Sequence, residues 1–430
     1  DTSGSDASAV WETRFPELEA ELRLSAYGQW RKFRSTFTSV NAARDFETPA
    51  LDQFHVPATA AGGSAVWSMA WSAQHSLTLG ADTRWVTGET NEQFRYLDGE
   101  FTRLRRAGGQ QLFVGSFAEE TWLVSHAVTV VGSARLDHWQ LFDASRAESE
   151  RATGVATLAT EFADRRGYSL NGRLGASVNL SRSVLFRAAG YTGFRVPTLN
   201  ELYRPFRVGN VVTEANPELK PERLLGGEAA LEWRPLTSLR LTGTVFYNRL
   251  EDAIGNITLG FGPGTFDPGG FIPAGGVLRQ RRNVDLVTAP GAELTASWQV
   301  CTALRLRTSY LFTEPTIAEA SEASLRGNLL AQTPEHLVTA GLELSPTAKS
   351  FLTVQGHASG RQFEDDQNTT ELAPFFVVDA AAGYEFTEQF SGALKLENLF
   401  NSDIETGKSS DGLVSIGTPR FVSVQLRWQL

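Results

Sequence analysis

Apolar and polar residues alternate one by one along most of the chain. Across residues 18–30 the even positions are all apolar or glycine, whereas the odd positions are mostly charged or polar. A helix would spread both sets around its circumference, but successive side chains of a strand point to opposite faces. The alternation therefore predicts a strand with one apolar face, and its length of about a dozen residues suits a tilted membrane strand.

About 16 segments alternate in this way, and their connections are in turn short and long. Long polar loops are expected near residues 45–57, 89–109 and 143–167. Outer-membrane barrels have tight periplasmic turns and long extracellular loops, and their backbone groups must pair within the bilayer. The pattern predicts an all-β, antiparallel up-and-down transmembrane β-barrel that forms one domain over residues 1–430. The low-complexity start, residues 1–16, is expected to be a loop remnant or disordered.

The composition argues against several classes of function. A net charge of −10 argues against a nucleic-acid partner. Cys301 is the single cysteine, so neither an internal disulfide nor a cysteine-based zinc site is possible. The six histidines lack metal-ligand spacing, and no hydrolase elbow or phosphate-binding loop occurs. We expect no enzyme activity, cofactor or metal, and we interpret Glu364, Asp365 and Asp366 as a solvated loop rather than a calcium site.

Two motifs in the middle of the chain and two near its end carry a family resemblance. GYTGFRVPTLNELYRP (residues 190–205) and NPELKPE (216–222) join two alternating segments, and LENLFN (396–401) and GTPR (417–420) precede the final one. Together they resemble the barrels of TonB-dependent outer-membrane receptors. The resemblance implies an outer-membrane protein of a Gram-negative bacterium. Barrels of this kind have about 22 strands and a plugged lumen, so the plug and the first strands are expected to be missing here.

The resemblance also implies a function and a set of partners. The receptor would capture a scarce, bulky ligand, such as a siderophore or other metal chelate, cobalamin or a carbohydrate, and import it with energy from the TonB system. Its own plug domain, TonB, the barrel-assembly machinery and the lipid bilayer would be its partners. A passive diffusion porin of about 16 strands is the alternative, and an adhesin or enzyme built on a barrel is a third hypothesis.

Charged and aromatic residues of the long loops are the candidates for contact with ligand or plug. A charge on the lipid face costs about 2–4 kcal/mol at mid-bilayer, so these residues are expected at the lumen or the loop mouth. Arg281 and Arg282 have a second interpretation, in which they lie in the headgroup zone. The candidates are Arg195, Tyr203, Arg204, Arg207, Arg281 and Arg282.

The last segment resembles the C-terminal assembly signal of bacterial outer-membrane proteins. Apolar residues occupy the final position and every second position before it, with an aromatic residue near the end. The terminal residue is Leu rather than the usual Phe. The predicted signal consists of Val424, Leu426, Trp428 and Leu430.

Overall fold

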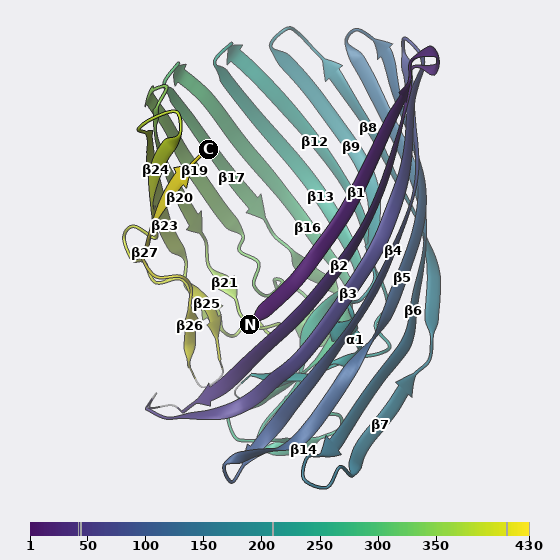
Figure 1. Cartoon of the computed structure of the whole chain (residues 1–430), viewed down its shortest axis with the longest axis vertical. Helices are drawn as coiled ribbons and strands as arrows, with labels where there is room; N and C mark the ends of the chain where they lie inside the picture. The colour runs from purple at the N-terminus through teal and green to yellow at the C-terminus, as the bar shows by residue number, and fades with distance from the viewer. Residues whose placement is uncertain (42, 44, 209, 410–411, 430) are drawn as a thin grey trace. The chain divides into compact units, whose positions relative to one another are not determined.

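The computed structural model describes residues 1–41, 43, 45–208, 210–409 and 412–429. Strands dominate these residues, and the remaining regular elements are a short helix, α1 (Leu199–Tyr203), and two 3-10 turns at Pro16–Leu18 and Ala323–Leu325 (Figure 1). The chain forms two compact units. Unit 1 comprises Asp1–Gly175, Tyr191–Leu224 and Glu251–Val284, and unit 2 comprises Ala176–Gly190, Leu225–Leu250 and Asp285–Leu430.

Unit 1 is built on a meander of long antiparallel strands, in which each strand pairs with the next. These strands are β1 (Thr2–Phe15), β2 (Ala20–Val40), β3 (Glu47–Ser72), β4 (His75–Leu97), β5 (Glu100–Ser125), β6 (Val128–Glu150) and β7 (Ala156–Phe162). Its short loop strands are β10 (Phe206–Val208), β11 (Val211–Glu214), β14 (Gly264–Phe266) and β15 (Gly270–Ile272).

Five strands run through both units: β8 (Arg165–Asn179), β9 (Val184–Arg195), β12 (Glu222–Leu236), β13 (Leu239–Phe261) and β16 (Val277–Cys301). Unit 2 continues with β17 (Leu304–Thr313), β18 (Thr316–Glu319), β19 (His336–Thr347), β20 (Ser350–Ser359), β21 (Gln362–Phe363), β22 (Glu371–Leu372), β23 (Phe375–Glu385), β24 (Phe390–Glu397), β25 (Glu405–Lys408), β26 (Val414–Ile416) and β27 (Phe421–Trp428). Its long strands also pair antiparallel with their neighbours along the chain.

The start of the chain is a strand, so the prediction of a loop remnant or disorder over residues 1–16 is wrong. β1 pairs with β2 without a break from Thr2 to Phe15. Its sequence lacks a strong apolar face, but β2 supplies hydrogen-bond partners for its backbone and cross-strand ion pairs for its side chains. One such pair joins Arg31 to Asp6 at 2.7 Å.

The predicted loops near residues 45–57, 89–109 and 143–167 are also largely strand. β3 and β5 each have 26 residues, whereas a membrane strand needs about 9–11. The hairpin ends therefore extend far beyond the membrane thickness as paired, polar sheet. Asp98 and Gly99 close the β4–β5 hairpin with φ values of 52° and 93°, as the two central residues of a type I′ turn require. Among the described residues, β1, β7 and the short loop strands account for the strands beyond the expected 16.

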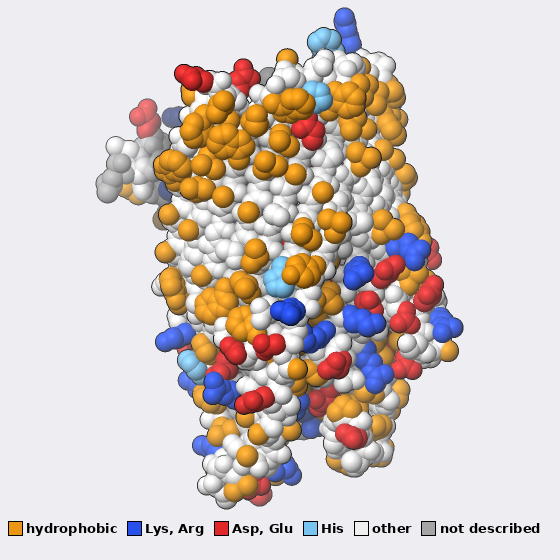
Figure 2. Space-filling view, turned by 90° about the vertical axis from the view of Figure 1, so that its right-hand side faces the viewer, with side chains coloured by type: hydrophobic (Ala, Val, Ile, Leu, Met, Phe, Trp, Pro, Cys, Tyr) orange, Lys and Arg blue, Asp and Glu red, His pale blue; other side chains and the backbone are white. Residues whose placement is uncertain are grey.

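The sheet of unit 1 has one apolar and one polar face near its short turns. Trp67, Leu79, Ala118 and Ala134 face each other in register on the apolar face. On the opposite face Arg135 lies between Asp82, at 2.7 Å, and Asp137, at 2.6 Å. Figure 2 shows one face of the molecule, with hydrophobic side chains gathered over its upper part and charged side chains over its lower part.

Among the described residues, no helix has the length and apolar composition that crossing a membrane would require.

Candidate functional site

The connection between β9 and β12, residues 196–221, folds back onto the polar face of unit 1, and we call it the strap. Leu202, Tyr203 and Leu219 of the strap are at most 1% exposed and pack against Trp139 and Leu141 of β6. Trp139 and Leu141 have the same parity as Asp137, which places them on the polar face. This long connection is therefore a folded layer with its own core rather than an open loop.

The sequence of the strap specifies its short helix. Thr198 is the N-cap of α1, and its side chain accepts from the backbone N–H of Glu201, while the carboxylate of Glu201 accepts from the backbone N–H of Thr198. This is a capping box, which satisfies two free N–H groups at the start of a helix. Arg195 then joins both ends of the strap, because its guanidinium donates to Glu201 at 2.9 Å and to Glu222.

Side chains from the neighbouring strands bind the backbone of the strap directly. Gln111 donates to the carbonyl of Pro197 at 2.8 Å, and Arg165 donates to the carbonyls of Pro217 and Leu219. Arg281 donates to the carbonyls of Asn200 at 2.7 Å and Arg204 at 2.9 Å. Buried carbonyls need such partners, and the prolines of this segment have no N–H with which to form a ladder.

A buried ion-pair network fixes the strap to the sheet, and Glu92 of β4 lies at its centre. Glu92 is fully buried and accepts from Gln53 at 3.1 Å, Arg105 at 3.3 Å and the Nε of Arg204 at 2.6 Å. Arg204 belongs to the strap, so Glu92 connects the strap to β3, β4 and β5.

The network continues from Arg105 to β6. Arg105 donates to Glu148 at 2.8 Å, and Arg146 binds Glu148 at 2.7 Å and Glu214 of the strap at 3.5 Å. Burial alone would raise the pKa of Glu148, but Arg105 and Arg146 outweigh it and hold the pKa below the ordinary value. We call the six charged residues the Glu92 network: Glu92, Arg105, Arg146, Glu148, Arg204 and Glu214.

The structure brings three of the predicted site residues together around α1: Arg195, Arg204 and Arg281. Each binds groups of the protein, and Arg281 also lies over the ring of Phe206, 5.0 Å from its centroid. Burial lowers the pKa of Arg281. These three arginines hold the strap together, which is a structural role that the charge argument from sequence did not distinguish from ligand contact.

The other three predicted residues are Tyr203, Arg207 and Arg282. Tyr203 is 1% exposed and packs 4.8 Å from the ring of Phe162, so it presents no surface to a ligand in this structure and we reassign it to the core. Arg282 donates to Gln280 at 2.9 Å. Arg207 is exposed on β10.

The sequence interpretation missed Glu92, Arg105, Arg146 and Glu148 because their segments were assigned to loops. The Asp98–Gly99 pair was the signal that identifies them, since Asp-Gly between paired segments is a strong hairpin indicator. In that hairpin, Glu92 of β4 is directly in register with Arg105 of β5, so the turn alone places this ion pair.

The motif LENLFN of unit 2 has a structural role. Asn398 is 2% exposed with φ of 48°, and its side chain donates to the carbonyls of Ser402 at 2.8 Å and Thr418 at 3.1 Å. Asp379 accepts from the backbone N–H of Asn398 at 2.8 Å. The motif therefore shapes the chain where it leaves β24, and GTPR supplies the carbonyl of Thr418.

In the acidic loop, Asp365 binds the loop's own backbone. Its carboxylate accepts from the backbone N–H groups of Gln367 at 2.9 Å, Thr369 at 3.0 Å and Thr370 at 2.7 Å. Burial alone would raise the pKa of Asp365, but these hydrogen bonds outweigh it and lower the pKa below the ordinary value. The carboxylate organises a turn, as Asp side chains commonly do.

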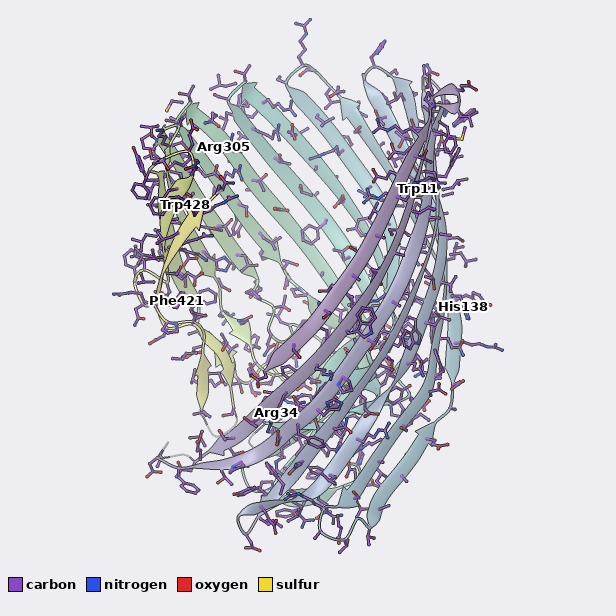
Figure 3. All side chains as sticks on the ribbon, viewed as in Figure 1. Trp11, Arg34, His138, Arg305, Phe421 and Trp428 are labelled. Carbon is purple, nitrogen blue, oxygen red and sulfur yellow. The ribbon has the colours of Figure 1, made fainter. Side chains whose placement is uncertain are left out.

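The final strand, β27, pairs with β24 from Phe421 to Trp428. Val424, Leu426 and Trp428 of the predicted assembly signal are 64–69% exposed, and Trp428 lies near the end of β27 (Figure 3). Leu430, the fourth member, lies outside the described residues. The assembly role of these residues stays a prediction.

Comparison with known proteins gives consistent results. The family model for the TonB-dependent receptor-like β-barrel matches residues 2–399. The iron-regulated outer membrane virulence protein of Vibrio cholerae serotype O1 is 25% identical over 307 residues, which are 69% of this chain and 42% of that protein. The vitamin B12 transporter BtuB of Vibrio vulnificus is 26% identical over 258 residues, 59% of this chain and 37% of the transporter. The chain thus spans less than half the length of these relatives.

Solved structures share the fold. The copper transporter OprC superposes with a TM-score of 0.77 at 16% identity, over 99% of this chain and 65% of that chain. The ferric yersiniabactin uptake receptor FyuA of Yersinia pestis gives 0.73 at 14% identity, over 99% and 61%. The resemblance found in the sequence is confirmed: the chain belongs to the TonB-dependent receptor family and forms part of an outer-membrane β-barrel of that family.

Proposed function

We propose that this chain is the barrel wall of a receptor that captures a scarce, bulky ligand outside the cell and imports it with energy from the TonB system. Family membership over residues 2–399 is the observation that carries the proposal. The named relatives include a vitamin B12 transporter and an iron-regulated outer-membrane protein, which supports cobalamin or a metal chelate as the ligand class. A plug domain and TonB would be the partners.

The strap supports the same function physically. A diffusion pore needs a lumen open to water, whereas a receptor needs rigid loop surfaces that are already in their binding conformation. In unit 1 the strap covers part of the polar face and is fixed there by the Glu92 network. Arg207 is exposed on the strap, and we retain it as a candidate for contact with an anionic ligand.

Uptake by the full-length receptor tests the proposal. The receptor is expressed in a host that lacks its own iron and cobalamin receptors, and cells receive radioactive iron as catecholate, hydroxamate or citrate chelates, or radioactive cobalamin. We expect saturable uptake of one compound class above that of cells with an empty vector. Uptake that rises linearly with concentration for every compound would support the porin instead, and uptake of none would contradict this ligand class.

A further inference from the structure

On the apolar face of unit 1, near the short turns, a carboxylate lies among aromatic rings. Glu120 of β5 accepts from the Trp71 indole N–H at 3.5 Å, and its other oxygen lies 2.8 Å from Nδ1 of His75. The His75 ring is tilted against Trp71, with centroids 4.7 Å apart, and stacked on Trp122 at 5.7 Å. We call these four residues the Trp71 box: Trp71, His75, Glu120 and Trp122.

The box faces the lipid side of the wall. Glu120 is in register with Leu77 on β4 and Gly132 on β6, and Trp122 is in register with Val130. Residues in register on neighbouring antiparallel strands share a face, so the carboxylate lies on the apolar face rather than beside Arg135 and Asp137. Trp71 is 57% and Trp122 43% exposed, and tryptophans of membrane proteins gather at the interface with the headgroups.

The carboxylate has room beside it. Gly132 has no side chain, and a Cβ added there would meet only Leu174, at 3.8 Å. The surface next to Glu120 is therefore recessed towards β6. The side chain of Glu120 is 36% exposed, and an ionised carboxylate offers about four acceptor sites, so it can accept further hydrogen bonds beyond those from His75 and Trp71.

We propose that the Trp71 box binds the primary ammonium headgroup of a membrane phospholipid. The ammonium would donate to Glu120 and lie against the indole faces of Trp71 and Trp122, which attract cations. Its positive charge would balance the negative charge of the carboxylate, which has no charged residue in register on β4 or β6. The lipid would come from the leaflet at the short-turn end, since the box lies within a few residues of the β3–β4 and β5–β6 turns.

Lipid retention by the full-length receptor tests this site. The purified receptor is titrated in detergent with phosphatidylethanolamine, phosphatidylcholine and phosphatidylglycerol of identical acyl chains, and bound lipids are counted by native mass spectrometry. We expect phosphatidylethanolamine to bind about threefold to tenfold more tightly than phosphatidylcholine, which keeps the positive charge but cannot donate to a carboxylate. Equal binding of these two lipids would overturn the proposal.

Two variants and a matched control locate the effect. Glu120→Gln should abolish the preference for phosphatidylethanolamine, and Trp122→Leu should weaken the binding of both phosphatidylethanolamine and phosphatidylcholine. Glu119→Gln changes the adjacent exposed residue on the opposite face and should leave the preference intact. Loss of the preference in Glu119→Gln, or its persistence in Glu120→Gln, would overturn the proposal. Heat-modifiable gel mobility shows whether each variant is folded. If Glu120→Gln does not fold, unchanged lipid binding by Trp122→Leu would overturn the proposal.

Discussion

Replacing Glu92 by Gln should release the strap from the sheet. Glu92 is fully buried between two guanidiniums, and the side chains of Arg105 and Arg204 are only 11% and 14% exposed. Removing one partner of a buried pair costs about 3–5 kcal/mol, because a charge is left without compensation. A cost of about 3 kcal/mol raises the equilibrium constant for local opening by a factor of roughly 150.

Hydrogen exchange of the strap measures this change. Exchange of peptides covering α1, β10 and β11 is followed by mass spectrometry in the full-length receptor. We expect these peptides to exchange at least a hundredfold faster in Glu92→Gln, whereas peptides of β19 and β20 keep their rates. Local opening of this kind is what native-state exchange reports.

A matched substitution on the same strand provides the control. Glu89 also pairs with an arginine of β5, but the side chain of that residue, Arg106, is 65% exposed. Exposed pairs contribute about 0–1 kcal/mol, so Glu89→Gln should change strap exchange by no more than about fivefold. Unchanged strap exchange in Glu92→Gln, or equal acceleration in both variants, would refute the assignment of Glu92 as the main attachment.

Three further predictions concern the strap and unit 2. Tyr203→Ala should cost about 3–5 kcal/mol of strap stability by leaving a cavity, whereas Tyr203→Phe should cost far less; strap exchange compares them, and equal losses would argue against a packing role. The pKa values of Glu201 and Glu148 lie below their ordinary 4.5, so their contribution to the stability of the strap is complete above about pH 4.5 and is lost as the pH falls through the lowered values. Pepsin should therefore cut the strap faster at pH 3 than at pH 4.5, after correction for the activity of pepsin on a peptide at each pH. An equal corrected rate at the two pH values would contradict this. Asn398→Ala should cost about 1–3 kcal/mol by leaving buried carbonyls without donors, measured as a lower heat-induced gel transition than for Ser402→Ala.

The alternation in the sequence was sufficient to predict the strands near the short turns, because one face there must be apolar. It failed for the outer parts of β3 to β6. Those parts are polar on both faces, so period-2 alternation of hydrophobicity disappears even though the backbone still pairs. The Asp98–Gly99 turn carries the missing information through its backbone geometry rather than through hydrophobicity. The sequence did not predict β1 as a strand for a related reason, because its pairing depends on β2 and on ion pairs such as Arg31–Asp6.

For the candidate site, the sequence identified residues that the structure places in or beside the strap, but it did not predict that several of them bind the protein itself. Their contact with ligand or plug stays a prediction. Arg195, Arg204 and Arg281 were selected for their charge, and all three bind the protein itself. One partner of each lies 27, 112 and 81 residues away in the chain, and no local pattern encodes contacts at such separations. The second partner of Arg195, Glu201, is only 6 residues away. Tyr203 illustrates the same problem for an aromatic residue, whose burial depends on β6 and β7.

The energy dependence of uptake tests the central functional claim most directly. Cells that express the full-length receptor take up the radioactive compound identified above, with and without a protonophore, and the initial rates are compared. An importer driven by the TonB system should bind the compound at the surface in both cases and lose its uptake when the proton-motive force collapses. Uptake that continues at the same rate without the proton-motive force would contradict the account and indicate a passive pore.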